Sequence, residues 1–284
     1  MVRIRYIQTG KRRITMEAIN NIHFTDEAIA GLIIQSVLMM ILPVILVIIW
    51  KIKTRERMLP IIIGGVTWLL FAIILKLAPA YLLLYADNPA AKTISGNIWY
   101  TMILSGALAG IFEETGRFIA FKTVLRKYEH RRSSLSYGIG HGGFESVYIG
   151  FQFFSFVVIG IMINSGMGDQ LINGANDAQI ATMISQLTQE SQVTIGECLL
   201  GVFERIPSIV THIAFSVLVF AAAREKKYIW LYPLAIFLHA LTDFSTVFYS
   251  AGIVPLWAME LIITCFAAVI AYIASRVYKK LKAE

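Results

Sequence analysis

The chain has 284 residues, of which 57% are hydrophobic and 15% are charged, and its mean hydropathy is +0.68. A typical soluble domain is about 45–50% apolar and about 25% charged. The composition therefore excludes an ordinary soluble domain, and 12% aromatic residues exclude a disordered chain. The net charge of +7 comes from basic residues that cluster between apolar blocks. This arrangement indicates membrane topology rather than nucleic-acid binding.

Long apolar blocks set the predicted architecture. Each is long enough to cross a bilayer, which takes about 20 residues, so we expect an all-α, polytopic membrane protein. The predicted transmembrane helices, about seven in number, cover residues 28–50, 61–85, 98–123, 135–163, 198–223, 229–249 and 254–276. The expected organisation is a polar N-terminal segment (1–27), a transmembrane domain (28–276) containing a polar outer segment (164–197), and a cytoplasmic tail (277–284). Within the outer segment, residues 178–189 predict an amphipathic helix.

Connections rich in lysine and arginine alternate along the chain with connections that contain few of them. The basic ones are 51–60, 124–134, 224–228 and the C-terminal tail, and the others are 86–97 and 164–197. By the positive-inside rule, this alternation predicts a multi-pass protein of the cell membrane with its N-terminus outside and its C-terminus in the cytoplasm. Residues 1–15 are basic and break the pattern, so we expect translation to begin at Met16.

The predicted spans contain many ionisable residues. A charged side chain at the middle of a membrane helix costs about 2.5–3.5 kcal/mol, so such residues usually mark a functional site. The ionisable and histidine residues of interest are Glu113, Glu114, Arg117, His141, Glu145, Glu204, Arg205, His212, His239 and Asp243. We expect the adjacent Glu204 and Arg205 to have separate partners, and we expect Lys76 and Glu260 to reach towards the membrane surface.

The spacing of these residues places several pairs on one helix face. The pairs four residues apart are Glu113 and Arg117, His141 and Glu145, and His239 and Asp243. At a rise of 1.5 Å per residue, four residues lie about 15–17 Å from the predicted cytoplasmic ends, namely Glu113, Glu145, His212 and His239, while His141 lies about 9 Å from its end. Two histidines and a carboxylate form a familiar set of zinc ligands, and a nearby glutamate would serve as general base. The glycines around His141 are expected to permit close helix packing.

The motifs resemble those of intramembrane proteases of the CAAX-protease and bacteriocin-processing superfamily. Within it the chain is most similar to YhfC-type membrane peptidases, with PrsW-type proteases as close relatives. The matching segments are EETGR (113–117), HGGFE (141–145), HIAFS (212–216) and HALTD (239–243). The resemblance implies a CAAX-protease-like helical bundle and peptide-bond hydrolysis in or near the bilayer.

Two mechanisms are open for this chemistry. The expected catalytic residues are Glu113, Glu114, Arg117 and Asp243, and the expected metal ligands are His141, Glu145, His212 and His239. In the first mechanism, which we favour and which makes zinc the expected cofactor, the two later histidines bind zinc together with Glu145 or Glu114, and Glu113 or Glu114 activates water. In the second, no metal takes part: Glu114 and one histidine activate water, while the other histidine and Asp243 stabilise the oxyanion.

The expected substrate is a membrane-associated or transmembrane peptide or protein, and the expected partners are this substrate and the lipid bilayer, without nucleic acid. Two other functions compete with proteolysis. An ion- or proton-coupled transporter also uses paired carboxylates and histidines inside the membrane, although we find no internal repeat of the kind common in transporters. A non-catalytic membrane receptor or immunity protein on the same fold is the other alternative.

Overall fold

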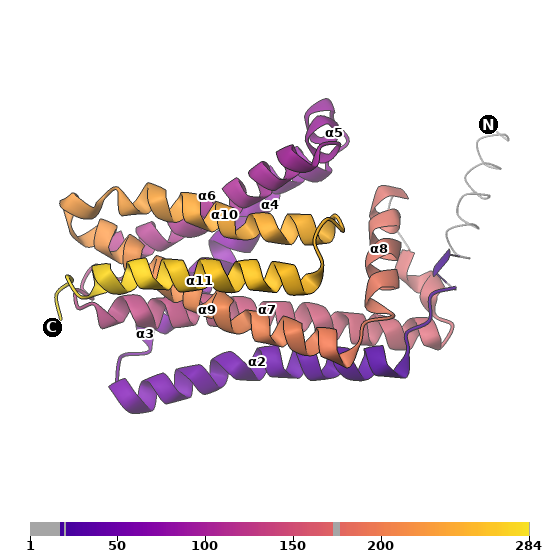
Figure 1. Ribbon diagram of the computed structural model, residues 1–284, viewed down its shortest axis with the longest axis horizontal. Helices are drawn as coiled ribbons and strands as arrows, with labels where there is room; N and C mark the ends of the chain where they lie inside the picture. Colours follow the sequence, from indigo (N-terminus) through magenta and orange to yellow (C-terminus); the bar gives the residue numbers. More distant parts are fainter. Residues whose placement is uncertain (1–17, 20, 173–176, 284) are drawn as a thin grey trace. The chain divides into compact units, whose positions relative to one another are not determined.

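The computed structural model describes residues 18–19, 21–172 and 177–283, so the expected start at Met16 lies outside the described part. The described residues form helices and no strand (Figure 1), which confirms the all-α prediction. The elements are α2 (Asp26–Thr54), α3 (Leu59–Trp68), η1 (Leu69–Leu75), α4 (Lys76–Ala80), η2 (Tyr81–Tyr85), α5 (Pro89–Ser95), α6 (Ile98–Lys122), α7 (Arg132–Asn164), η3 (Gly168–Ile172), α8 (Asp177–Glu190), α9 (Ile195–Arg224), η4 (Lys226–Tyr228), α10 (Leu231–Ser250) and α11 (Leu256–Tyr278).

These helices confirm the predicted multi-pass membrane protein. Among the described residues, six helices are long and apolar enough to cross a bilayer, and the total is seven if α5 and α6, which meet at 105°, count as one span. The second span, Leu59–Tyr85, is not a uniform α-helix, because η1 and η2 are π-helical. Every predicted span overlaps one of these segments.

The chain divides into two compact units. The first unit contains residues 1–40 and 148–202, and the second unit contains residues 41–147 and 203–284. In the first unit, α8 confirms the amphipathic helix predicted near 178–189. Its apolar residues recur at helical spacing: Leu187 belongs to the buried cluster of this unit, and Ile180, Met183 and Ile184 are partly buried and pack against it.

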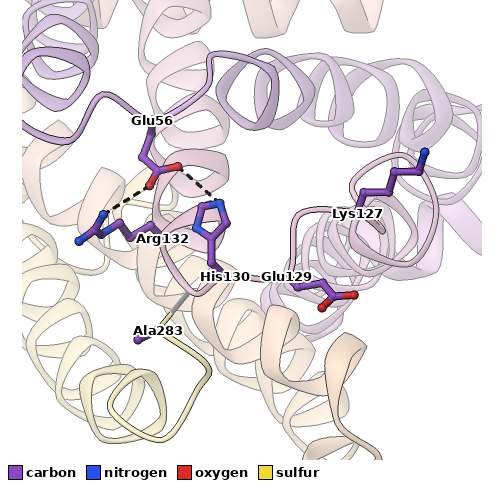
Figure 2. Close-up of a pocket in the computed structure, with 6 residues that line it drawn as sticks. All are labelled: Glu56, Lys127, Glu129, His130, Arg132 and Ala283. Carbon is purple, nitrogen blue, oxygen red and sulfur yellow. Dashed lines mark ion pairs between the residues drawn. The ribbon is translucent and has the colours of Figure 1, made fainter.

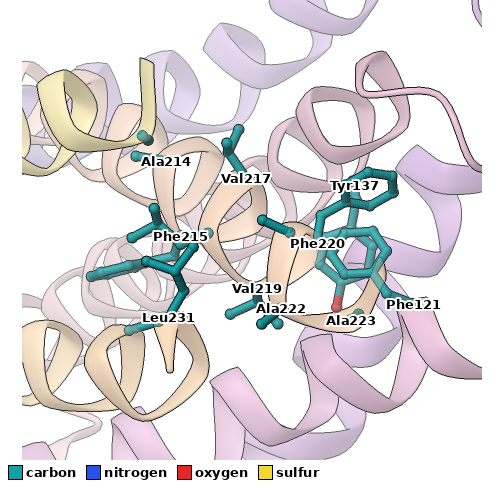
Figure 3. Packing of buried hydrophobic residues seen from close by; sticks show 14 of the residues in the cluster. Phe121, Tyr137, Ala214, Phe215, Val217, Val219, Phe220, Ala222, Ala223 and Leu231 are labelled. Atoms are coloured by element: carbon teal, nitrogen blue, oxygen red, sulfur yellow. The ribbon is translucent and has the colours of Figure 1, made fainter. Parts of the chain in front are cut away.

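The core of the second unit is centred on the last part of α9. Residues 214–223 of this helix include a nearly continuous buried apolar run that packs with residues of α6, α7, α10 and α11 (Figure 3). The ring of Phe121 on α6 lies 4.7 Å from that of Tyr137 and 5.1 Å from that of Phe220. Tight packing of these rings fixes the helices that carry the polar residues described below.

Glycines bring α7 close to its neighbours in the second unit. A Cβ atom at Gly138 would collide with the backbone of α9, and one at Gly140 would collide with the carbonyl of Ile61 on α3, whereas one at Gly142 would be tightly packed against α9. This confirms the close helix packing expected of these glycines. Because His141 lies among them, its side chain is held in the interior, where it is fully buried.

Three of the basic connections meet at one end of the second unit. Glu56 lies 3.7 Å from the His130 ring and 3.9 Å from Arg132, and these residues line a surface pocket (Figure 2). The backbone N–H of Arg131 donates to the carbonyl of Lys282 in the C-terminal tail at 3.0 Å. Connections 51–60 and 124–134 and the tail therefore share one end, as alternating spans require. The intramembrane residues named above do not line this pocket.

Candidate functional site

Close packing of α6 against α10 positions the first two glutamates. The two helices lie side by side (Figure 1), and a Cβ atom at Gly106 or Gly110 would lie within 2.6 Å of a carbonyl oxygen of α10. With the backbones this close, the next turn of α6 brings Glu114 against His239. Oε1 of Glu114 accepts a hydrogen bond from Nδ1 of His239 at 2.7 Å.

Glu114 links a buried arginine to a histidine. Arg117 and Glu114 are both fully buried, and Nη1 of Arg117 lies 3.4 Å from Oε2 of Glu114. Because Nδ1 of His239 donates to Glu114, the neutral ring keeps its lone pair on Nε2. That nitrogen lies 3.8 Å from Oε2 of Glu113 and 3.9 Å from Oδ2 of Asp243. His239 is thus oriented with its free nitrogen towards the other carboxylates.

Glu113, His141 and His212 form a group that can hold a metal ion. One donor atom from each lies within 4.8 Å of the others, and all three residues are buried. Nε2 of His141 lies 3.1 Å from Oε2 of Glu113. Two imidazoles and a carboxylate are typical zinc donors, with bonds of about 2.0–2.2 Å. Small side-chain rotations would bring these donors onto one ion, so the residues present fit the metal.

His212 has contacts on both sides of its ring. Arg117 donates to the backbone carbonyl of His212 at 3.1 Å, and its Nη2 lies 3.3 Å from Nδ1 of the ring. Nε2 of His212 lies 2.7 Å from Oε2 of Glu145. Ligation through Nε2 would place the ring proton on Nδ1. Arg117 would then keep its bond to the carbonyl of His212, which still holds α6 to α9, and its contact with Glu114.

Glu145 bridges this site and a second charged cluster. Its other oxygen, Oε1, accepts from Nη1 of Arg205 at 3.2 Å. Nη2 of Arg205 also donates to Glu204, so the expectation that these adjacent residues have separate partners was wrong. Neighbouring residues do not face each other on an ideal helix, but the long arginine side chain folds back towards its own neighbour.

The structure brings all eight predicted site residues into one network of contacts, although the grouping differs from the predicted roles. Glu113 lies with His141 and His212 rather than apart from them. His239 contacts Glu114 directly instead of completing that group. The division into ligands and catalytic groups therefore stays a prediction, which we revise below.

Lys76 is a further residue beside the candidate site. Its Nζ lies 3.9 Å from Oε1 of Glu113, so the expectation that it reaches the membrane surface was wrong. The backbone N–H of Lys76 bonds to the carbonyl of Phe71, five residues back, which closes a π-helical turn. Phe71 packs on Gly116, one turn from Glu113 on α6, and the wide turn brings Lys76 to the carboxylate. A lysine inside a span was the available signal, but the π turn is not visible in the sequence.

Glu260 on α11 was also expected at the surface. It is instead buried, with 5% of its area exposed, and both carboxylate oxygens are without a hydrogen-bond partner. The expectation failed because Glu260, one turn into α11, faces the bundle rather than the lipid.

Comparisons with known proteins identify the family of the chain. Residues 38–264 match the family described as YhfC intramembrane metalloprotease. The chain is 30% identical over 251 residues to a protein of Bacillus subtilis (strain 168) named "Uncharacterized membrane protein YhfC", covering 87% of this chain and 95% of that protein. No solved structure matches the chain. The family match covers most of the chain and includes the candidate metal group. The chain is therefore a multi-pass membrane protein that belongs to the YhfC intramembrane metalloprotease family.

Proposed function

We propose that this protein is a zinc-dependent endopeptidase that hydrolyses a peptide bond in or near the bilayer. The observation that carries the proposal is the buried group of Glu113, His141 and His212, whose donor atoms lie within 4.8 Å of one another. Three buried metal donors on separate helices are costly to a fold and are typical of a function. The family to which the chain belongs supports the same reaction class.

Glu113, His141 and His212 would hold the zinc ion. When bound, zinc would act as a Lewis acid that polarises a carbonyl oxygen and makes water a better nucleophile. The carboxylate of Glu113 offsets part of the charge of the dication. The buried position of the three residues limits access of bulk solvent to the reacting groups.

Glu145 is the general base in this proposal. It lies next to a ligand, with Oε2 2.7 Å from Nε2 of His212, and it is more accessible than the fully buried Glu114. A general base must lie within hydrogen-bonding reach of the water from which it takes a proton. Arg205 holds the other oxygen of Glu145 and compensates its charge.

His239 is the general acid that protonates the leaving amine. Its Nδ1 donates to Glu114, and Arg117 fixes Glu114 from the other side. This leaves Nε2 to carry and release the proton, as in other catalytic histidines that a carboxylate orients. Asp243, 3.9 Å from Nε2, helps to hold the protonated ring. Arg117, Glu114 and Asp243 then act through His239 as positioning residues.

The proposed substrate is a peptide segment of a membrane-associated or transmembrane protein, because the site lies on helices that cross the bilayer. With the basic end of the second unit in the cytoplasm, the positive-inside rule places the N-terminus outside. Reporter fusions at each terminus test this topology. A cytoplasmic N-terminus would contradict it.

Metal analysis of the purified protein tests the proposal. We expect one zinc ion per chain in the natural protein and its loss in His212→Ala, with retention in His130→Ala, a histidine at the surface pocket. A second measurement compares new protein N-termini in membranes from cells with the natural protein or with Glu145→Gln. Equal zinc contents in the two histidine variants would refute the metal site. Unchanged N-termini would refute proteolysis and favour a transporter.

A further inference from the structure

A second charged cluster in the second unit extends from the proposed site towards the end at which α11 begins. It contains three carboxylates and one guanidinium: Glu145, Glu204, Glu260 and Arg205. Arg205 binds the first two directly. Glu260 is buried on α11, and neither of its carboxylate oxygens has a hydrogen-bond partner. The proposed mechanism assigns no task to Glu260.

The cluster has free hydrogen-bonding groups of complementary kinds. The Nε–H of Arg205 is a buried donor without a partner, and Oε1 and Oε2 of Glu260 are buried acceptors without one. A buried polar group without a hydrogen bond costs about 1–3 kcal/mol, and a charged group costs more. Packing alone therefore does not account for a carboxylate at this position. Water satisfies such groups when two to four polar partners surround it.

We propose that Arg205 and Glu260 line a water passage from the end of the second unit where α11 begins to Glu145 and His212. In this proposal, water molecules fill the space between the free N–H of Arg205 and the oxygens of Glu260, groups that no direct hydrogen bond joins. From Arg205 the polar path continues through direct contacts, to Oε1 of Glu145 at 3.2 Å and from Oε2 of Glu145 to His212 at 2.7 Å.

The passage would supply the water that peptide-bond hydrolysis consumes, and this role rests on the proposed function. Hydrolysis of each peptide bond consumes one water molecule, whose OH joins the acyl carbon and whose remaining proton goes to the amine nitrogen. The passage ends at Glu145, the proposed base. The basic connections lie at the other end of the second unit, where α11 finishes and Arg131 binds Lys282. Water thus enters from the end opposite to the basic connections.

Accessibility of single cysteines in lipid nanodiscs tests the passage. The natural cysteines Cys198 and Cys265 are first replaced by alanine and serine, and the probe is a membrane-impermeant trimethylammonium methanethiosulfonate. We expect Glu260→Cys to react at least about tenfold faster than Met259→Cys or Ile263→Cys, because a thiol must ionise in water to react. The two control positions are buried and apolar on the same helix, with 8% and 3% exposure.

A second variant tests the passage independently, in case the first variant does not fold. Glu204→Cys should also react faster than Phe203→Cys, its neighbour with an exposed apolar side chain. Equal rates at both positions and their controls would overturn the passage. Labelling does not depend on proteolysis, so slow labelling refutes only the passage. Fast labelling of a protein that leaves all N-termini unchanged refutes only the proposed protease.

Discussion

The two halves of α9 within the second unit show how one helix serves both packing and chemistry. Residues 214–223 include a buried run of apolar side chains, whereas the preceding turns carry Glu204, Arg205 and His212. The apolar half gains stability from close contact with four other helices. The polar half contains buried charges. Replacing such charges with well-packed apolar residues often leaves a protein equally stable or more stable. The apolar core therefore holds the polar residues of the site in position, and the burial of those polar residues costs stability.

The regions also meet. The ring of Phe215, at the start of the apolar half, stacks on His239 at 5.1 Å with an interplanar angle of 5°. The guanidinium of Arg117 lies 6.0 Å from the same ring. The core therefore extends directly under the oriented histidine. Variants in the two regions should nonetheless change different quantities.

The largest effect should come from Glu145→Gln. Gln keeps the shape and the hydrogen bond to Arg205 but cannot take a proton, so kcat should fall by about 10²–10⁴-fold. Stability and zinc content should change little, since Glu145 is not in the proposed ligand group. Cleavage of a substrate found from its new N-terminus, with thermal unfolding in detergent, measures both. Loss of zinc in this variant would return Glu145 to the ligands.

Phe220→Ala should have the opposite profile. Phe220 is buried, packs edge-on to Phe121 at 5.1 Å, and lies 4.9 Å from the guanidinium of Arg224. Its truncation should lower the free energy of unfolding by about 3–5 kcal/mol, while the folded protein keeps its zinc. Phe237→Ala, at a ring with 59% exposure, is the matched control and should change little. A zinc content that falls with stability would show that the two regions are not separable.

Lys76→Met tests how a positive charge beside Glu113 affects the affinity of the proposed site for zinc. Lys76 lies 3.9 Å from Oε1 of Glu113. Its positive charge would compete with the proposed zinc ion for this carboxylate. Its removal should raise zinc affinity by about tenfold, because a nearby positive charge is lost. Titration against a competing chelator measures the change. Lys92→Met, which breaks the exposed pair with Asp87, should leave the affinity unaltered. An unchanged affinity in Lys76→Met would mean that Lys76 does not act on the ligand group.

The sequence predicts the spans and a set of candidate site residues that lie close together, because both depend on local features. Runs of apolar residues and spacings of four are visible in one segment at a time. The roles of Glu113 and Glu145 depend on how α6, α7 and α9 are rotated against one another. That rotation follows from close contacts at glycines, such as the contact of Gly138 with α9. The sequence alone does not show which helix each glycine contacts. The π turn before Lys76 and the inward face of Glu260 escaped prediction for the same reason.

The smallest effect concerns a carboxylate outside both regions and outside the spans. Burial, together with the charge of Glu197, raises the pKa of Glu190 at the end of α8 to about 7. The folded state then holds more protons than the unfolded state between pH 4.5 and about 7, so stability should fall as the pH rises through this window. Hydrogen exchange of α8 amides, corrected for intrinsic rates, should show weaker protection at pH 8 than at pH 5.

Glu190→Gln should remove most of this pH dependence, because no charge is then forced into the first unit at pH 8. The matched control is Asp87→Asn. Lys92 binds Asp87 and lowers its pKa, so that carboxylate is ionised at both pH values and its loss should leave the difference in place. If Glu190→Gln kept the full difference, another group would be responsible. If it removed the difference, a buried carboxylate beside a like charge would cost stability here too. The charges around His212 would then be a larger case of the same cost, retained because the site uses them.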